Sequence, residues 1–209
     1  MKPFAAPLLL LCSLSLTGCQ APAPSGNSTV AGLETHYSPA ENLETIDARV
    51  LRGARHTIDY CAYSLTDHLL AESLIAAAQR GVHVRLYLDQ VQTAGEVSRE
   101  EKKSAGSEEE ETDNSSAMLV LRTLDRTPNV EIKVKRSKTL MHLKSYAVDG
   151  VTLRSGSANF SPTGEKRQDN DMVLTNDAAS VQRFEKNFAI LWARTDNEPL
   201  SELGHNASR

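Results

Sequence analysis

The sequence predicts one α/β domain over residues 33–195, an α-β-α sandwich built around a mixed central sheet. Runs rich in β-forming residues alternate with amphipathic helical stretches through the first half, which is typical of α/β folds. The pair Asp149-Gly150, a favoured hairpin turn, separates two later strand candidates, so part of the sheet must be antiparallel. The composition, 40% hydrophobic and 24% charged in 209 residues, suits a globular protein with one core.

The N-terminal segment differs from the rest of the chain. Lys2 precedes an apolar run, Leu8 to Leu16, that is too short to cross a bilayer, so residues 1–19 are predicted to be a secretory signal. The run ends in Leu16-Thr17-Gly18-Cys19, which resembles a bacterial lipobox whose cysteine is acylated. We expect export with lipidation at Cys19, and Gln20 in place of Asp favours an outer-membrane anchor facing the periplasm. A plain cleaved signal, giving a secreted protein, is the alternative.

Residues 20–32 are predicted to form a flexible tether, because they are rich in Pro, Ala, Ser and Gly and have little to bury. Ser38 and Pro39 are typical of a helix start, and Glu41 can complete a capping box. The elements predicted for the first half are a strand over Leu33–Tyr37, a helix from Pro39 to Ala54, a strand over His56–Tyr63, a helix capped by Thr66 and ended by Gly81, and a strand over Val82–Leu88.

The segment from Thr93 to Ala117, residues 93–117, is predicted to be an acidic insertion. It holds eight acidic and three basic residues and lacks apolar periodicity, so we expect a mobile, exposed loop. An electrostatic gate or a cation-binding tail is the functional alternative. The formal charge of the whole chain is −4, but from Met118 onward there are 14 basic and 11 acidic residues. This half is therefore mildly basic, as a phosphate-bearing substrate would favour.

The second half is predicted to be richer in strands. Its elements are a helix over Met118–Leu124, strands over Val130–Val134, His142–Val148, Val151–Ser157 and Asp171–Thr175, and a helix capped by Asp177 that reaches Trp192. Residues 196–209 are predicted to be a polar tail. Cys61 is the one cysteine that remains once Cys12 and Cys19 are assigned to the signal, so we expect no intrachain disulfide and a buried, small apolar role.

The chemically active side chains concentrate in the predicted hairpin. His142 and Lys144 are two residues apart on a strand, so their side chains share one face of the sheet. A two-residue turn would place Lys144 opposite Ser155 and His142 opposite Ser157, with Asn159 just beyond. The patch combines an imidazole, an ammonium group, hydroxyls and an amide. Such a set is a nucleophile or acid–base group beside donors suited to phosphate oxygens.

The same stretch resembles a known family. His142-x-Lys144, four residues, Asp149, six residues and then Gly156-Ser157-x-Asn159 match the full signature of the phospholipase D superfamily. Three N-terminal segments, Tyr37-Ser38-Pro39, Ala62-Tyr63-Ser64, and Arg80 to Arg85 with Leu88-Asp89 after it, resemble its small single-motif members. Those members include bacterial endonucleases and the mitochondrial cardiolipin hydrolase group. The resemblance runs from about residue 33 to 192, interrupted by the acidic insertion, and implies a phospholipase D-like fold.

The resemblance also implies a two-step displacement at phosphorus. His142 would form a phosphohistidine, while a second histidine would protonate the leaving oxygen and then activate water. Lys144, Ser157 and Asn159 would hold the phosphate oxygens. Asp149 belongs to the catalytic signature, although its place in the turn favours local structural support. No metal or other cofactor is expected, because superfamily members need none and the sequence has no cysteine cluster or paired-carboxylate motif.

The second histidine must come from somewhere, because the chain has one copy of the motif and no internal repeat. A two-fold homodimer that brings both copies of His142 to a shared active site would supply it. The other histidines lack an accompanying Lys and Asn, so we expect structural or solvated roles for His36, His56, His68, His83 and His205.

The chain departs from the family pattern after the Gly-Ser-x-Asn segment, where related sequences place a Glu-Asn pair whose acid orients the histidine. Here the run is Gln168-Asp169-Asn170-Asp171, and counting puts Asn170 at the position of the acid. We favour Asp171, at the predicted strand start, as the orienting acid, with Asp169 as the alternative and a plain polar loop as the third possibility. A neighbouring carboxylate would raise the pKa of the histidine and fix its tautomer.

Three functions compete. Hydrolysis of a membrane phospholipid, the phospholipase D reaction, is favoured because a lipid anchor would hold the site near headgroups and the acidic insertion would hinder polyanion binding. An endonuclease is the rival, although aromatic residues for base stacking are only 5%. Its basic groove would be built from Lys133, Lys135, Arg136, Lys138, Lys166 and Arg167. A non-catalytic binding module is the remote alternative, and the intact motif argues against it.

Overall fold

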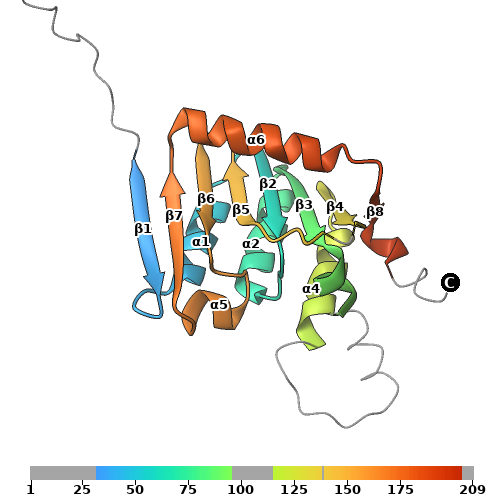
Figure 1. The fold of residues 1–209 in the computed structure, drawn as a ribbon, viewed down its shortest axis with the longest axis horizontal. Helices are drawn as coiled ribbons and strands as arrows, with labels where there is room; N and C mark the ends of the chain where they lie inside the picture. Colours follow the sequence, from blue (N-terminus) through green and yellow to red (C-terminus); the bar gives the residue numbers. More distant parts are fainter. Residues whose placement is uncertain (1–31, 96–114, 138, 204–209) are drawn as a thin grey trace, which may run out of the picture. The chain divides into compact units, whose positions relative to one another are not determined.

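The computed structural model describes residues 32–95, 115–137 and 139–203 (Figure 1). Its strands are β1 (Leu33–Ser38), β2 (Thr57–Ala62), β3 (His83–Asp89), β4 (Val130–Lys135), β5 (Lys144–Val148), β6 (Thr152–Gly156), β7 (Asn170–Thr175) and β8 (Asn197–Pro199). Its helices are α1 (Leu43–Arg52), α2 (His68–Gln79), α4 (Ser115–Asp125), α5 (Pro162–Lys166), α6 (Ala178–Trp192) and the short 3-10 helix η1 (Leu200–Glu202).

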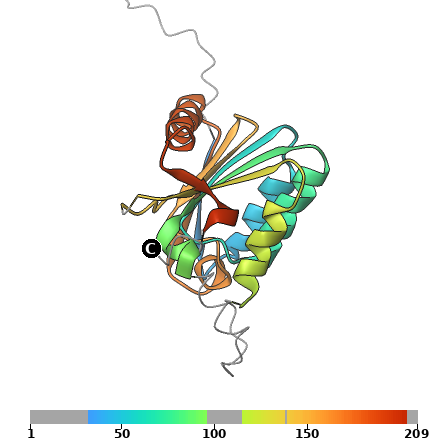
Figure 2. The same ribbon diagram turned by 90° about the vertical axis from the view of Figure 1, so that its right-hand side faces the viewer.

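The strands form one mixed sheet in the order β1-β7-β6-β5-β2-β3-β4-β8. Strands β2, β3 and β4 are parallel to one another, and every other neighbouring pair is antiparallel. Helices α1, α2 and α4 cover one face of the sheet, and α6 crosses the other (Figure 2). The predicted α-β-α sandwich with a mixed sheet is therefore confirmed.

The core is divided between the two faces of the sheet. Ile58, Tyr60 and Ala62 of β2 belong to the main cluster, together with residues of α1, α2 and α4. Cys61, between them in sequence, packs instead with Phe188 of α6, because neighbouring side chains of a strand point to opposite faces. Cys61 is fully buried and burial raises the pKa of its thiol, so the predicted small apolar role is confirmed.

In the first half of the chain, both predicted N-cap residues were wrong by a few positions in the sequence. Ser38 ends β1, and its hydroxyl donates to the carbonyl oxygen of Gln168 at 2.7 Å. Asn42 caps α1 instead, so this helix begins later than predicted. Asp67, rather than Thr66, caps α2. In both cases the residue that caps has an Asx side chain, which accepts a hydrogen bond from a backbone N–H of the first turn.

The hairpin between β5 and β6 has a register one residue away from the predicted one. Val148 pairs with Thr152, whereas a two-residue turn would have paired it with Val151. Asp149 and Gly150 both have positive φ, 54° and 63°, and a third residue completes the turn. Each predicted cross-strand pair is shifted accordingly, because register in a hairpin is set by the turn.

The C-terminal segment was also predicted incorrectly. Residues 197–203 are not a polar tail, since β8 pairs with β4 and both Leu200 and Leu203 are buried in the main core. The short helix α5 was missed as well. The insertion is shorter than predicted, because Thr93 is buried and residues 115–117 belong to α4.

The rest of the acidic insertion, residues 96–114, lies outside the described residues. The predicted signal, the lipidation site Cys19 and nearly all of the tether lie outside them too. Across the part of the chain that the structure describes, no helix has both the length and the apolar character needed to span a membrane.

Candidate active site

The predicted phosphate-handling residues gather at one edge of the sheet. Strand β5 begins at this edge with Lys144, which lies opposite Ala62 at the end of β2. Strand β6 ends here at Gly156, and its partner β7 begins here. The edge therefore brings together the segment before β5, the loop after β6 and the ends of β2 and β3. His142, which was predicted to lie within a strand, stands just ahead of β5.

His142 is exposed, and the backbone on either side of it is held in place. The N–H of Met141 donates to Oδ2 of Asp89 at 2.8 Å, and the carbonyl of Leu143 accepts from the N–H of Tyr63 at 3.0 Å. The ring of Tyr63 meets the imidazole edge-on, with centroids 4.6 Å apart. These contacts fix the position of the imidazole while leaving it open to solvent. Asp89 was not predicted as a site residue, although an acid at the end of a buried strand is a usable signal.

Lys144 is buried beside the histidine. Its Nζ donates to the carbonyl oxygen of His142 at 2.9 Å and lies 4.8 Å from the centroid of the Tyr63 ring. Burial lowers the pKa of Lys144, the nearby Arg154 lowers it further, and Asp89 opposes both. The ammonium therefore retains donors for an anion in a site of reduced polarity, where charge–charge attraction is strong.

Ser157 is held by Asp171, the second residue of β7. Oδ1 of Asp171 accepts from the Ser157 hydroxyl at 2.5 Å and from its N–H at 3.1 Å. This hydroxyl is the first cause of the lowered pKa of Asp171. The strands approach so closely here that a Cβ on Gly156 (φ 148°) would lie 2.3 Å from the carbonyl oxygen of Asp171. The glycine of the motif is therefore required by backbone packing.

Asn159 is half-buried in the loop between β6 and α5. Its Oδ1 is buried and has no hydrogen-bond partner among the residues that the structure describes. The loop is compact: Ser161 N–H donates to the Asn159 carbonyl at 2.8 Å, and a Cβ on Gly164 would lie 2.5 Å from that same oxygen. Ser161 also caps α5. The short helix thus fixes the loop that presents the amide of Asn159.

Residues 48–192 match the family described as "Cardiolipin synthase, PLD-like domain". This match covers more than half of the chain. The chain belongs to this family. The resemblance to the phospholipase D superfamily, first seen in the motif at residues 142–159, is confirmed.

Known proteins that are similar to this PLD-like domain support the same family. Cardiolipin synthase C of Escherichia coli is 27% identical over 74% of this chain and 34% of its own length. A mitochondrial cardiolipin hydrolase of Xenopus laevis is 24% identical over 70% of this chain and 59% of its own length. The chain thus spans about a third to three fifths of these two relatives. The structure of Nuc, a phospholipase D family member from Salmonella typhimurium, superposes with a TM-score of 0.65 at 19% identity, covering 81% of this chain and 97% of that one.

Asp149 was counted with the catalytic signature, but it does not lie at the sheet edge that carries His142, Lys144 and Asn159, here called the active edge. It stands at the far end of β5, where its carboxylate accepts the backbone N–H groups of Arg55, His56 and Thr57 at 2.7 to 2.9 Å. Burial alone would raise the pKa of Asp149, but the hydrogen bonds from these three N–H groups outweigh it, and the pKa is lowered. These contacts are those of the structural role anticipated for Asp149 from its place in the turn.

The acid predicted to orient His142 is engaged elsewhere. Asp171 binds Ser157, Asp169 is exposed, and the amide of Asn170 donates to the carbonyl of Gly164 at 2.9 Å. Among the described residues, no carboxylate forms a hydrogen bond with the imidazole of His142, whose side-chain contact is the Tyr63 ring. Counting along the sequence correctly placed Asp171 at the start of a strand near the motif. It could not predict whether Asp171 binds His142 or Ser157.

The remaining histidines lie away from the active edge or are solvated. His36 pairs with Glu41 at 2.8 Å and His83 with Glu131 at 2.6 Å. His56 and His68 are exposed, and His205 lies outside the described residues. None of the four described histidines has the lysine and asparagine that accompany His142.

Proposed function

We propose that this PLD-like domain is a metal-independent phosphodiesterase that hydrolyses a membrane phospholipid through a phosphohistidine intermediate. The observation that supports this most directly is the placement of three motif residues at one sheet edge: His142, whose imidazole is exposed, Lys144 and Asn159. They provide a nucleophile and groups that can bind a phosphate.

The proposed reaction has two displacements. In the first, a neutral ring nitrogen of His142 attacks phosphorus, the bond from phosphorus to the leaving alcohol breaks, and a second histidine gives its proton to that oxygen. In the second, the same histidine takes a proton from water, the resulting hydroxide attacks phosphorus, and the N–P bond breaks. Lys144 offsets negative charge on the non-bridging oxygens in both steps.

The second histidine would come from a second copy of the chain. His142 is exposed, and Leu140 and Leu143 beside it are 49% and 37% exposed, so the nucleophile is bordered by apolar surface. A two-fold contact at this edge would bury that surface and place two copies of His142 at one site. One copy would then act as nucleophile and the other as acid and base.

A phospholipid is preferred over a nucleic acid because the expected basic groove is weak. Lys133 donates to the carbonyl of Trp192 at 3.0 Å, Lys166 pairs with Glu44 at 2.7 Å, and Lys135 is buried. Lys138 lies outside the described residues. A site that binds one headgroup does not need such a groove, whereas a polyanion does. The relatives named for cardiolipin and the lipid anchor expected at Cys19 also favour this choice.

A parallel assay in EDTA tests the proposal. The chain from Gln20 onward receives vesicles of phosphatidylcholine and cardiolipin, or single-stranded and plasmid DNA. His142→Asn is the inactive control. His83→Asn, which removes an exposed histidine far from the motif, is the matched control. Lipid hydrolysis by the wild type and His83→Asn, with none from His142→Asn, is the expected result. Cleavage of DNA alone would make the protein a nuclease, and no activity from a folded dimer would favour a binding module.

A further inference from the structure

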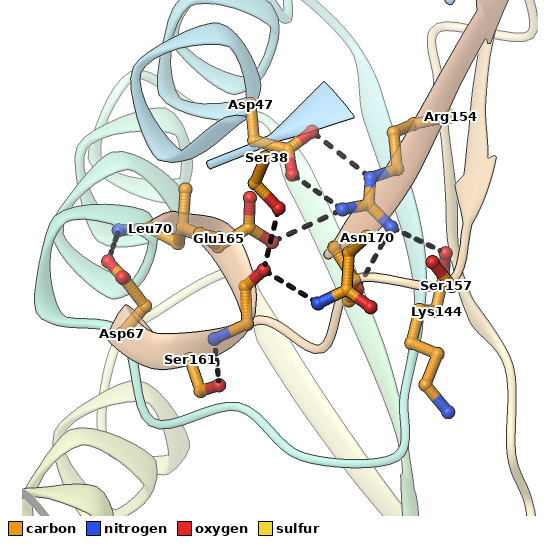
Figure 3. A network of polar contacts seen from close by, with 12 residues as sticks. Ser38, Asp47, Asp67, Leu70, Lys144, Arg154, Ser157, Ser161, Glu165 and Asn170 are labelled. Atoms are coloured by element: carbon orange, nitrogen blue, oxygen red, sulfur yellow. Dashed lines mark hydrogen bonds and ion pairs between the residues drawn. The ribbon is translucent and has the colours of Figure 1, made fainter. Parts of the chain in front are cut away.

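Behind the active edge lies a fully buried charged cluster, Asp47, Arg154 and Glu165, each with no exposed surface (Figure 3). Arg154 comes from β6, Asp47 from α1 and Glu165 from α5. None of the three is among the fixed residues of the motif that the proposed reaction uses. The cluster joins the two helices to the sheet directly beneath the catalytic residues.

The guanidinium of Arg154 forms four hydrogen bonds and an additional ion-pair contact with Asp47. Nη1 donates to the carbonyl oxygen of Lys144 at 2.8 Å and to that of Ala158 at 3.3 Å. Nε lies 3.3 Å from Oδ1 of Asp47, and Nη2 lies 3.1 Å from its Oδ2 and 3.2 Å from Oε1 of Glu165. The guanidinium is planar and rigid, so these bonds fix the positions of their acceptors relative to one another. One nitrogen, Nη1, thus binds the backbone of both halves of the catalytic motif.

We propose that Arg154 is a positioning residue that sets the separation between Lys144 and the loop of Ser157 and Asn159. Lys144 approaches the substrate from β5, and the loop approaches from β6, so their spacing decides whether both reach the same phosphate. Asp47 and Glu165 hold the guanidinium from the opposite side, which prevents it from shifting toward solvent. The inference rests on the proposed function, because the spacing matters only if both groups bind one phosphate.

Stability alone is a weak reason for this cluster. Replacing a buried ion triad with apolar residues is often neutral or stabilising, because burying charges costs solvation energy. Two carboxylates face one guanidinium, and Glu44, Asp67 and Lys166 border the cluster. Burial, followed by the charge of Asp47, raises the pKa of Glu165 to about 9, so Glu165 is protonated at neutral pH. Burial also raises the pKa of Asp47, which accepts hydrogen bonds from Tyr146 at 2.7 Å and from Arg154.

The test separates positioning from stability. The triple variant Asp47→Leu/Arg154→Met/Glu165→Leu removes the charges together and leaves no unpaired buried ion. Arg85→Met is the matched control: it breaks an arginine–aspartate pair of 2.7 Å with Asp59, an interaction of the sheet that involves no motif residue. Each full chain is assayed for the melting temperature, for kcat and KM on phospholipid vesicles, and for affinity toward inorganic phosphate by calorimetry.

We expect the triple variant to melt at or above the wild-type temperature, to lose about 100-fold in kcat, as a displacement on the order of 1 Å would cause, and to bind phosphate more weakly. Arg85→Met should lower the melting temperature and leave kcat unchanged. A folded triple variant with wild-type kcat and phosphate affinity would overturn the inference. If the triple variant does not fold, Arg154→Lys, which keeps the charge but loses the planar fork, is measured in its place with the same criteria.

The two proposals can fail separately. A wild-type protein that hydrolyses neither lipid nor DNA contradicts the proposed function, and the phosphate titration then decides the role of Arg154 alone. In that case weaker phosphate binding by the triple variant supports positioning, and equal binding contradicts it. A wild-type protein that hydrolyses neither substrate and binds no phosphate contradicts both.

Discussion

Ser157 and Asp171 hold each other by hydrogen bonds in both directions. The hydroxyl and the N–H of Ser157 donate to Oδ1 of Asp171, and the N–H of Asp171 donates to the Ser157 Oγ at 2.9 Å. The one hydroxyl proton of Ser157 is therefore committed to a carboxylate. Ser157 can orient the loop of the motif, but it has no free proton for a phosphate oxygen while this pair persists.

This pairing predicts a small effect of Ser157 on catalysis. Ser157→Ala should lower kcat about tenfold, whereas Lys144→Met, which removes a cation from the phosphate site, should lower it at least about 100-fold. Asp171→Asn should resemble Ser157→Ala, and the double variant should be no worse than either, because both changes break the same contact. A double-mutant cycle of kcat on phospholipid vesicles measures this. Additive losses would mean that the two residues act independently.

Tyr63 is predicted to support both catalytic side chains through its ring. Lys144 lies over its face and the ring of His142 packs against it at an interplanar angle of 60°, while no described hydrogen bond of its hydroxyl contributes to these contacts. Tyr63→Phe should therefore retain kcat within about twofold, and Tyr63→Ala should lower it by about tenfold or more, since a cation–π contact and a packing surface are lost together. The kcat values of the two variants decide the point, and equal losses from both would assign the role to the hydroxyl instead.

The raised pKa of Glu165 predicts that the stability of the fold depends on pH. Its pKa is raised to about 9 in the folded protein, so between its unfolded value and about 9 the folded state holds a proton that the unfolded chain has released. The free energy of unfolding should therefore fall as pH rises through this range and level off above it. Glu165→Gln cannot titrate and should show a flatter profile. Denaturant unfolding of both proteins at pH 5, 7 and 9 measures the difference, and parallel profiles would contradict the raised pKa.

Asp149 is predicted to affect stability rather than chemistry. Its carboxylate accepts three backbone N–H groups at the start of β2, at the sheet edge opposite the site. Asp149→Ala should reduce the free energy of unfolding by about 2 kcal/mol and leave kcat of the folded protein nearly unchanged. Asp196→Ala, which removes an exposed ion pair with Arg194, is the control and should have a much smaller effect on the free energy of unfolding. A large fall in kcat for folded Asp149→Ala would restore a catalytic role.

The sequence predicted the parts of this fold that depend on local patterns. Apolar periodicity located most strands and helices, and the residue types of the motif pointed to the candidate site, because both signals are contained within short stretches of sequence. The cap of α1 was misplaced because Ser38 is drawn into β1 by pairing with β7, a contact between residues far apart in sequence. Strand β8 was missed because its three residues are stabilised by β4 and by the burial of Leu200.

The supporting contacts of the site were equally hidden from the sequence. Arg154 sits in the variable part of the motif, and its partners Asp47 and Glu165 are recognisable only once α1 and α5 pack against the sheet. Counting from the motif was used to predict the acid that orients His142. In the structure, the hairpin register and the close approach of the strands at Gly156 place Asp171 in a hydrogen bond with Ser157 instead. These contacts join residues that are far apart in the sequence, so they could not be predicted before the fold was known.

The most direct test of the account is to trap the covalent intermediate. The wild type and His142→Asn are mixed with a short-chain phospholipid in EDTA, stopped with alkali within one turnover, digested and analysed by mass spectrometry. We predict a phosphoramidate (N–P) adduct on His142 in the wild type and none in the variant. Turnover that continues without any adduct on His142, or an adduct on another residue, would contradict nucleophilic attack by this histidine.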